Sequence, residues 1–368
     1  MIHGAFVKGL FTLTICSLAA LAHADHAAVA AHPAGQSYSS NNQANAIAAS
    51  TQALQSCRAA HPQSPTKCEL VSLNGKDVIT TDAVKARLPE KPHPLYLWRL
   101  QANESTIYLG GSIHILKPGF YPLPKQFEDA FAQSDYLVFE VDTNQTSAAE
   151  MQALSLRYGR LPESTSLSSV LPGDTFSELK HALTDYGVNL EHFEQFKPNF
   201  ISQQLAVLAL LSVGYDPEVG LENHFRRKQG NRTILQLETV EFQLDLLFNV
   251  ALPTQVEMTE DMLKQLPTFE ETTADLVTAW LAGDDQAFLA AVDAQSGETP
   301  AVKAFNRRLI IERNYGMTDT ITGYLQQPGT YFVLVGAAHL IGDEGIPALL
   351  AKAGYTPSRL STHSSLTQ

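Results

Sequence analysis

Two histidines of the 368-residue chain occur in matching contexts, at opposite ends of what the sequence predicts to be one domain. In each case an apolar run leads into the pattern Gly-x-x-His, once from Gly111 to His114 and once from Gly336 to His339. The small residue lets the backbone turn sharply at the carboxyl end of a predicted strand, where ligand sites of open α/β sheets gather. A single strand-end histidine is more often satisfied locally, but two matched copies favour a shared site. If the two strands are neighbours, both imidazoles face one cleft.

Acidic residues also follow predicted strands. Glu140 lies in the apolar run LVFEV, where an unpaired buried carboxylate would be costly, so it needs a metal, an imidazole or an arginine as partner. A structural ion pair is the alternative. Glu238, in QLETVEF, again ends a strand, whereas Glu222, in GLENHF, is either a site residue or part of a solvated helix face. Arg313, in IIERN, offers a fork of donors to a carboxylate or an oxyanion, or forms a surface salt bridge.

Two imidazoles and a carboxylate make an open metal site, because imidazole suits several divalent transition metals. The chain contains neither the G-x-S-x-G elbow nor an H-E-x-x-H helix. Their absence argues against serine hydrolases built on that elbow and against zincins.

The elements that must position these residues follow from apolar periodicity. A β-hairpin is predicted over 95–100 and 106–112, with the sequence ANES as its turn. Strands at both ends and helices between them predict an α/β (α+β) domain with a helix-rich middle region. Its central sheet would be formed by N- and C-terminal strand segments. Further strands are predicted at 136–141, 233–238, 331–336 and 355–360, and helices after Pro124 and at 147–158, 174–186, 199–213, 240–250, 256–266, 270–293, 298–327 and 344–353.

The chain begins with the pattern of a cleavable secretory signal. Lys8 precedes an apolar run from Leu10 to Leu21, and Ala22-His23-Ala24 supplies the small residues of a cleavage site. The run is shorter than the ~20 residues of a membrane-spanning helix. A buried N-terminal helix is the alternative, and lipidation of Cys16 is disfavoured because no small residue precedes it. We expect cleavage after Ala24 and a periplasmic or secreted protein without a membrane anchor.

Residues 25–94 are expected to precede the folded domain, which is predicted over 95–368. Residues 25–50 contain few large apolar groups to offset ordering entropy, and this composition predicts a disordered leader. A Pro-rich linker ends near residue 94. Cys57 and Cys68, the cysteines left after cleavage, are predicted to form a disulfide in an oxidising compartment. A metal site made by the two thiolates and His61 is the alternative, but the spacing matches no usual zinc pattern.

The chain is acidic, with 25 Lys and Arg against 38 Asp and Glu and a net charge of −13 at pH 7. Residues 1–24 carry one lysine and no acid, so cleavage brings the charge to −14. Such a surface repels phosphate backbones and anionic headgroups, which argues against nucleic acid and membrane surfaces as partners. The oligomeric state is not set by the sequence.

Several segments carry a resemblance to a known family. They are LYLWRLQANESTIYLGGSIH, YLVFEVD, GYDPEVGLENHFRRKQGNRTILQLETVEFQ, ERNYGM and YFVLVGAAHLIGDEGIPALLAKAGY. In this order, over about residues 95–360, the chain resembles the TraB/GumN family, which includes the animal TIKI proteins. The resemblance implies a fold of two related halves and, for the TIKI branch, a divalent-metal-dependent protease. The family's motif residues fall on His114, His339, Glu140, Glu222, Glu238 and the pair Arg313-Asn314.

Motif and resemblance together predict metal-dependent hydrolysis, with a peptide or protein as the substrate. His114, His339 and Glu222 would hold a divalent ion (Mn, Co or Zn), which acidifies water and polarises a carbonyl. Glu140 or Glu238 would take the proton of that water, and an arginine, Arg313, would steady the oxyanion. The alternative is a non-enzymatic periplasmic protein that binds a peptide, a metal or haem through the same histidines.

Overall fold

The structure is a computed structural model that describes residues 25–297 and 299–366. The predicted signal segment, residues 1–24, lies outside these ranges. The described chain has the mixed α/β fold and the helix-rich middle region expected from the sequence, but it contains two β-sheets where one central sheet was predicted. The two related halves implied by the family resemblance stay a prediction. No helix in the described ranges is long and apolar enough to cross a membrane.

The larger sheet has six strands. In spatial order they are β10 (Ser358–Ser361), β5 (Pro94–Ala102), β6 (Ser105–Ser112), β9 (Gly329–Gly336), β7 (Tyr136–Phe139) and β8 (Thr233–Gln236). β5 and β6 form the predicted antiparallel hairpin. β6, β9, β7 and β8 are parallel to one another, so their carboxyl ends lie along one edge of the sheet.

The two strands that precede the histidine motifs are direct neighbours. β6 and β9 pair in parallel over their whole length, from Ser105 opposite Gly329 to Ser112 opposite Gly336. The middle of β9, residues 331–335, is a continuous buried apolar run, which is typical of a central parallel strand covered on both faces. The two strands that lead to the histidines are therefore neighbours, as a shared cleft for both imidazoles requires.

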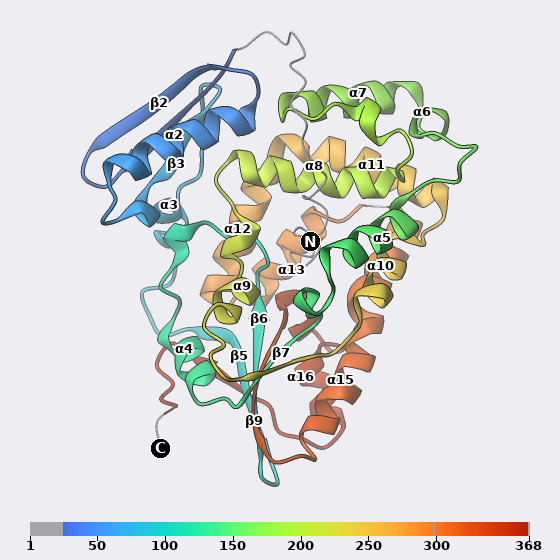
Figure 1. Cartoon of the computed structure of the whole chain (residues 1–368). Coiled ribbons are helices and arrows are strands. Elements are labelled where there is room, and N and C mark those ends of the chain that lie inside the picture. Colours follow the sequence, from blue (N-terminus) through green and yellow to red (C-terminus); the bar gives the residue numbers. More distant parts are fainter. Residues whose placement is uncertain (1–24, 298, 367–368) are drawn as a thin grey trace.

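The middle region is helical, close to the ranges predicted. Its main helices are α4 (Lys125–Ala132), α5 (Ala148–Gly159), α6 (Leu167–Val170), α7 (Gly173–Asp185), α8 (Pro198–Ser212), α9 (Leu221–Arg226), α10 (Val240–Phe248), α11 (Leu252–Gln265), α12 (Phe269–Ala282), α13 (Asp285–Ala294), α14 (Pro300–Arg307) and α15 (Arg313–Tyr324). A last helix, α16 (Ile346–Lys352), lies between β9 and β10. Figure 1 shows α7, α8 and α11 across the top of the molecule, with β5, β6 and β9 below them.

Two of the predicted helices are divided. The helix expected over 270–293 breaks at Gly283, which has a φ of +66° and lies so close to β5 that a Cβ atom would be 2.0 Å from the carbonyl oxygen of Pro94. The helix expected over 298–327 contains a π-helical turn, Arg308–Glu312, between α14 and α15. Turns of this kind are frequent at functional sites, and this one directly precedes Arg313.

The prediction of a disordered leader over residues 25–50 is wrong. These residues form β1 (His26–His32), β2 (Gln36–Gln43) and the start of α2 (Ala46–Ala60), and with β3 (Glu69–Leu73) and β4 (Lys76–Asp77) they build a sheet of order β2-β1-β3-β4. Alternate alanines of β1, Ala28 and Ala30, are buried where α2 packs on the strand, because small side chains let the two elements approach closely. The smaller sheet lies at the upper left of Figure 1.

Cys57 and Cys68 form the predicted disulfide, which joins the end of α2 to the residue before β3. Both sulfur atoms are thereby used, so the alternative metal site with His61 is wrong. The His61 ring instead stacks on His32, with ring centroids 3.8 Å apart, and its Nε2 atom lies 2.9 Å from the hydroxyl of Tyr38.

Candidate active site

The candidate site lies at the carboxyl edge of three adjacent parallel strands. His114 follows the end of β6 by two residues, and His339 lies in a 3-10 helix, Ala337–Leu340, directly after β9. Glu140 is the first residue after β7, which pairs with β9 on its other side. Residues far apart in the sequence are therefore brought to one edge by the parallel register.

Gly336 provides the space in which these side chains meet. A Cβ atom at this position would lie 3.3 Å from His114 Nε2, 3.3 Å from Glu140 Oε1 and 3.5 Å from His339 Cδ2. The backbone N–H of Gly336 also donates to Glu140 Oε1 at 2.6 Å. A side chain at this position would press on all three groups, so Gly336 keeps this space open in the second Gly-x-x-His motif.

Arg313 is a buried member of the site and not a surface residue, with 3% of its area exposed. Its guanidinium forms ion pairs with both Glu140 and Glu238, at 2.6 Å from Glu238 Oε2. Its Nη1 donates to the carbonyl oxygen of Leu309 at 3.1 Å and lies 3.2 Å from His339 Nε2. Burial opposes the charged form, but the two carboxylates outweigh it and raise the pKa of Arg313.

His339 is held as a neutral imidazole. Its Nδ1 lies 2.7 Å from Asn314 Oδ1, which can only accept, so Nδ1 carries the proton and Nε2 presents a lone pair to Arg313. Asn314 is itself oriented, because its Nδ2 donates to the carbonyl oxygen of Glu344 at 2.8 Å. Burial, reinforced by the Arg313 charge, lowers the pKa of His339 to about 3 against the opposing effect of Glu140.

His114 has the opposite electrostatic setting. Its Nδ1 lies 2.7 Å from Glu222 Oε1, which also accepts a hydrogen bond from the hydroxyl of Ser112. Burial opposes the charged imidazole, but the carboxylates of Glu222 and Glu140 outweigh it and raise the pKa of His114. Glu222 therefore contacts the nitrogen of His114 that is remote from Gly336, while Nε2 faces the shared space.

Gln243 is a site residue that the sequence analysis did not single out. It is 2% exposed, and its Nε2 donates to Glu238 Oε2 at 2.9 Å and to Glu140 Oε2 at 3.3 Å. It lies in the first turns of α10, five residues after Glu238 within the segment LETVEFQ. The spacing places it over the carboxylates, but only the pairing of β7 with β8 brings Glu140 to the same point.

The donor set fits a divalent cation in its chemistry. His114 Nε2 and Glu140 Oε1 border one space, and Nδ1 of each histidine is held by an oxygen acceptor, as is usual for imidazoles that bind metals. Over residues 25–297 and 299–366, no three His, Cys, Asp or Glu side chains are arranged to hold an ion. Since Arg313 contacts His339 Nε2, this nitrogen would bind a metal only after the guanidinium turns away.

The sequence is similar to curated proteins at low identity. It is 22% identical over 250 residues to the uncharacterized protein YbaP of Escherichia coli K12, which covers 66% of this chain and 87% of YbaP. It is 22% identical over 319 residues to the Metalloprotease TIKI homolog of Amphimedon queenslandica, with 72% of this chain and 61% of that protein covered. Metalloprotease TIKI1 of Danio rerio is 24% identical over 324 residues, with 74% and 64% covered.

The chain thus spans less than two thirds of the length of these two TIKI relatives. No solved structure matches it. The sequence profile of the TraB/PrgY/gumN family matches residues 96–359. This range contains the six strands of the larger sheet, apart from the first residues of β5 and the last residues of β10. This range also includes every residue of the candidate site. The chain therefore belongs to the TraB/PrgY/gumN family.

Proposed function

We propose that this protein is an exported, metal-dependent hydrolase that acts on peptides or proteins. The observation that carries the proposal is the gathering of His114 Nε2, Glu140 Oε1 and the His339 ring around Gly336 at the carboxyl edge of the sheet. Family membership and the distant relatives named as metalloproteases support the same class of reaction.

In this proposal His114 would hold the ion through its Nε2 atom, and His339 would join it through Nε2 once the Arg313 guanidinium has turned away. A bound divalent ion (Mn, Co or Zn) supplies Lewis-acid polarisation of a carbonyl and acidification of water. Glu222 and Asn314 orient the two rings from the Nδ1 side. Glu222, proposed from the sequence as a ligand, is assigned this orienting part because it contacts the remote nitrogen of His114.

The chain's own groups then move the proton and stabilise charge. Glu140 borders both histidines and is the proposed acceptor of the proton from the attacking water. Glu238 shares the Arg313 guanidinium with Glu140 and would keep it near the reacting groups after it has turned away from His339 Nε2. Arg313 contributes positive charge where the carbonyl oxygen becomes an oxyanion.

Export is proposed from two features. The N-terminal pattern predicts cleavage after Ala24, and the Cys57–Cys68 disulfide fits an oxidising compartment, where such bonds persist. Intact-mass measurement of protein from the periplasm or the medium checks the site of cleavage. A mass that retains residues 1–24 would contradict this part of the proposal.

The substitution Glu140→Gln tests the hydrolase. The mature protein is stripped with a chelator, and cleavage of a peptide library is measured with Mn, Co or Zn added. We expect metal-dependent cleavage by the wild type and a loss of about 10²-fold or more in Glu140→Gln, the usual contribution of a general base. Metal binding, measured by calorimetry, should persist in the variant because both imidazoles remain.

The matched control is Glu241→Gln, the same change at an exposed residue of α10 whose side chain pairs with Arg157. It should leave both cleavage and metal binding unchanged. If the wild type binds metal and peptides but cleaves none of them with any ion, the binding-protein alternative replaces the hydrolase.

A further inference from the structure

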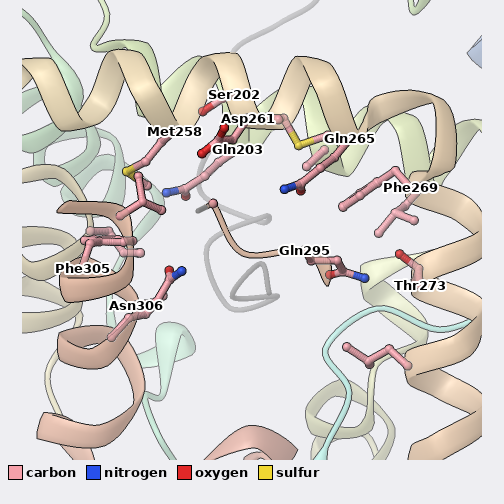
Figure 2. A pocket seen from close by; sticks show the side chains of 18 of the residues that line it. Ser202, Gln203, Met258, Asp261, Gln265, Phe269, Thr273, Gln295, Phe305 and Asn306 are labelled. Atoms are coloured by element: carbon pink, nitrogen blue, oxygen red, sulfur yellow. The ribbon is translucent and has the colours of Figure 1, made fainter. Parts of the chain in front are cut away.

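A cavity of about 170 Å³ lies beside the proposed catalytic site and shares His114 with it. Its wall is formed by the turn that follows β6, by α8, α11 and α12, and by the helical segment that leads to Arg313 (Figure 2). Leu309 lines the cavity, and its carbonyl oxygen accepts a hydrogen bond from Arg313. A group seated in the cavity would therefore lie next to the residues proposed to react.

The size and the wall of the cavity suit one large apolar side chain. Met258, Met262, Phe269 and Phe305 are among the residues that line it. A space of roughly 150 Å³ is large enough to hold a benzene ring. The volume therefore matches a single Leu, Met or Phe side chain and is too small for a longer segment of peptide.

Side-chain amides are directed at the same space. Figure 2 shows the amides of Gln203, Gln265, Gln295 and Asn306 around it. Those of Gln203, Gln265 and Asn306 have no hydrogen-bond partner among the described residues. A side-chain amide presents donors and an acceptor, as a peptide bond does, so these groups complement the backbone on either side of the bound side chain.

Asp261 adds a charge to this wall. Its Oδ2 is buried without a hydrogen-bond partner in the described chain, and its side chain is 19% exposed. The nearby cation, Lys264 Nζ, lies 3.5 Å from Oδ1 and is itself 73% exposed, so it compensates the carboxylate only weakly. A second carboxylate brought into the cavity would be repelled by this like charge.

We infer that this cavity is the subsite for a large apolar side chain of the peptide substrate, next to the bond that is cut, and that Asp261 excludes acidic side chains from it. The inference rests on the proposed hydrolase function. It assigns a substrate preference to residues of α8, α11 and α12, none of which belongs to the histidine motifs.

The test uses the mature protein and dye-labelled hexapeptides that differ at one position, which is Phe, Leu, Trp or Glu. Binding is followed by fluorescence anisotropy without added metal, and cleavage is followed separately with Mn, Co or Zn. We expect the Phe and Leu peptides to bind about tenfold more tightly than the Glu peptide, or better, given like charges at short range. Asp261→Asn should remove most of that difference by improving binding of the Glu peptide alone.

Glu260→Gln is the matched control, because it makes the same change of charge on the adjacent residue of α11, whose side chain accepts from Thr175 outside the cavity. It should leave the preference intact. Ala206→Phe, which fills the cavity, should abolish binding of the Phe and Leu peptides. Met262→Ala, which enlarges it, should shift the preference towards Trp and gives a readout if Ala206→Phe fails to fold.

Equal binding of the Phe and Glu peptides by the wild type, or no binding of any peptide, would overturn the subsite. An unchanged preference in Asp261→Asn would overturn the role of Asp261. If the preference and its response to the variants hold while no metal supports cleavage, the hydrolase fails and the side-chain subsite stands.

Discussion

His114 and His339 share a residue type and a sequence context, yet their surroundings shift their pKa values in opposite directions. A carboxylate, Glu222, accepts from Nδ1 of His114 and, with Glu140, raises its pKa although burial opposes the charge. A neutral amide, Asn314, accepts from Nδ1 of His339, whose pKa burial lowers to about 3. A shared Gly-x-x-His context therefore does not fix the electrostatic setting of its histidine.

Arg313 is the cation that allows two carboxylates to be buried at one point. In Arg313→Met, Glu140 and Glu238 lose their guanidinium partner, and we expect a loss of about 3–5 kcal/mol in the free energy of unfolding, measured in urea. The control is Arg157→Met, because the pair of Arg157 with Glu241 has side chains 67% and 54% exposed. That variant should lose less than about 1 kcal/mol.

If Arg313→Met and Arg157→Met lowered the free energy of unfolding by similar small amounts, Arg313 would not be the group that stabilises the buried carboxylates. The triple change Glu140→Gln, Glu238→Gln and Arg313→Met gives a further check. It should recover part of the stability lost in Arg313→Met, because it removes the buried charges that the single change leaves behind.

For single residues, the sequence predicted which side chains belong to the site better than it predicted which of them contact one another. Glu140, Glu238 and Arg313 were each candidates, but nothing in the spacing shows that one guanidinium pairs with both acids. The contact requires β7 and β8 to lie side by side and the π-helical turn to present Arg313 towards them. Gln243 was missed for the same reason, since its two partners come from different strands.

Among the elements, those with strong apolar patterning were predictable. The hairpin of β5 and β6 and the buried run of β9 followed from strand signals at the two ends of the domain. The break between α12 and α13 was missed because the apolar periodicity continues across Gly283. The N-terminal sheet was missed because its buried strand uses alanine, whose alternation is a weak signal beside the surrounding polar residues.

Gly283→Ala tests the cause of that break. The left-handed conformation costs a non-glycine residue about 1–2 kcal/mol, and the added methyl group also meets the Pro94 carbonyl. We expect Gly283→Ala to lower the free energy of unfolding by at least this amount, measured by thermal or urea unfolding. Gly316→Ala is the control, because Gly316 lies within α15 with open space around it, and alanine should stabilise the helix by roughly 1 kcal/mol. An increase in the free energy of unfolding in both variants would show that the break between α12 and α13 does not depend on Gly283.

In the whole molecule, the N-terminal sheet is joined to the family domain by buried polar contacts. Lys117, after β6, donates from Nζ to the carbonyl oxygen of Ile79 at 2.6 Å and lies 4.8 Å from the centroid of the Tyr215 ring. Glu270 of α12 accepts from the backbone N–H of Ile79 at 2.8 Å and lies 3.9 Å from the same ammonium. A residue near the site thus carries a charge at the junction with residues that precede the family match.

Lys117 makes the stability of the whole molecule depend on pH. Burial lowers its pKa from 10.5 to about 8, although Glu270 and Glu69 favour the charged form. Between pH 8 and 10.5 the unfolded chain therefore binds more protons at this lysine than the folded chain does. The contribution of Lys117 to the free energy of unfolding accordingly rises as the pH rises through this window and is lost as the pH falls towards 8.

Lys117→Met removes this titration. As the pH is raised from 8 towards 10, the free energy of unfolding of the wild type should therefore increase steadily relative to that of the variant. Urea unfolding at several pH values below 10 measures it, before the buried tyrosines, whose pKa values burial raises, oppose the trend. Lys125→Met is the control, since that side chain is 70% exposed and pairs with Asp129 on the same helix. Parallel stability curves for Lys117→Met and the wild type would show that the ammonium keeps an ordinary pKa at the junction.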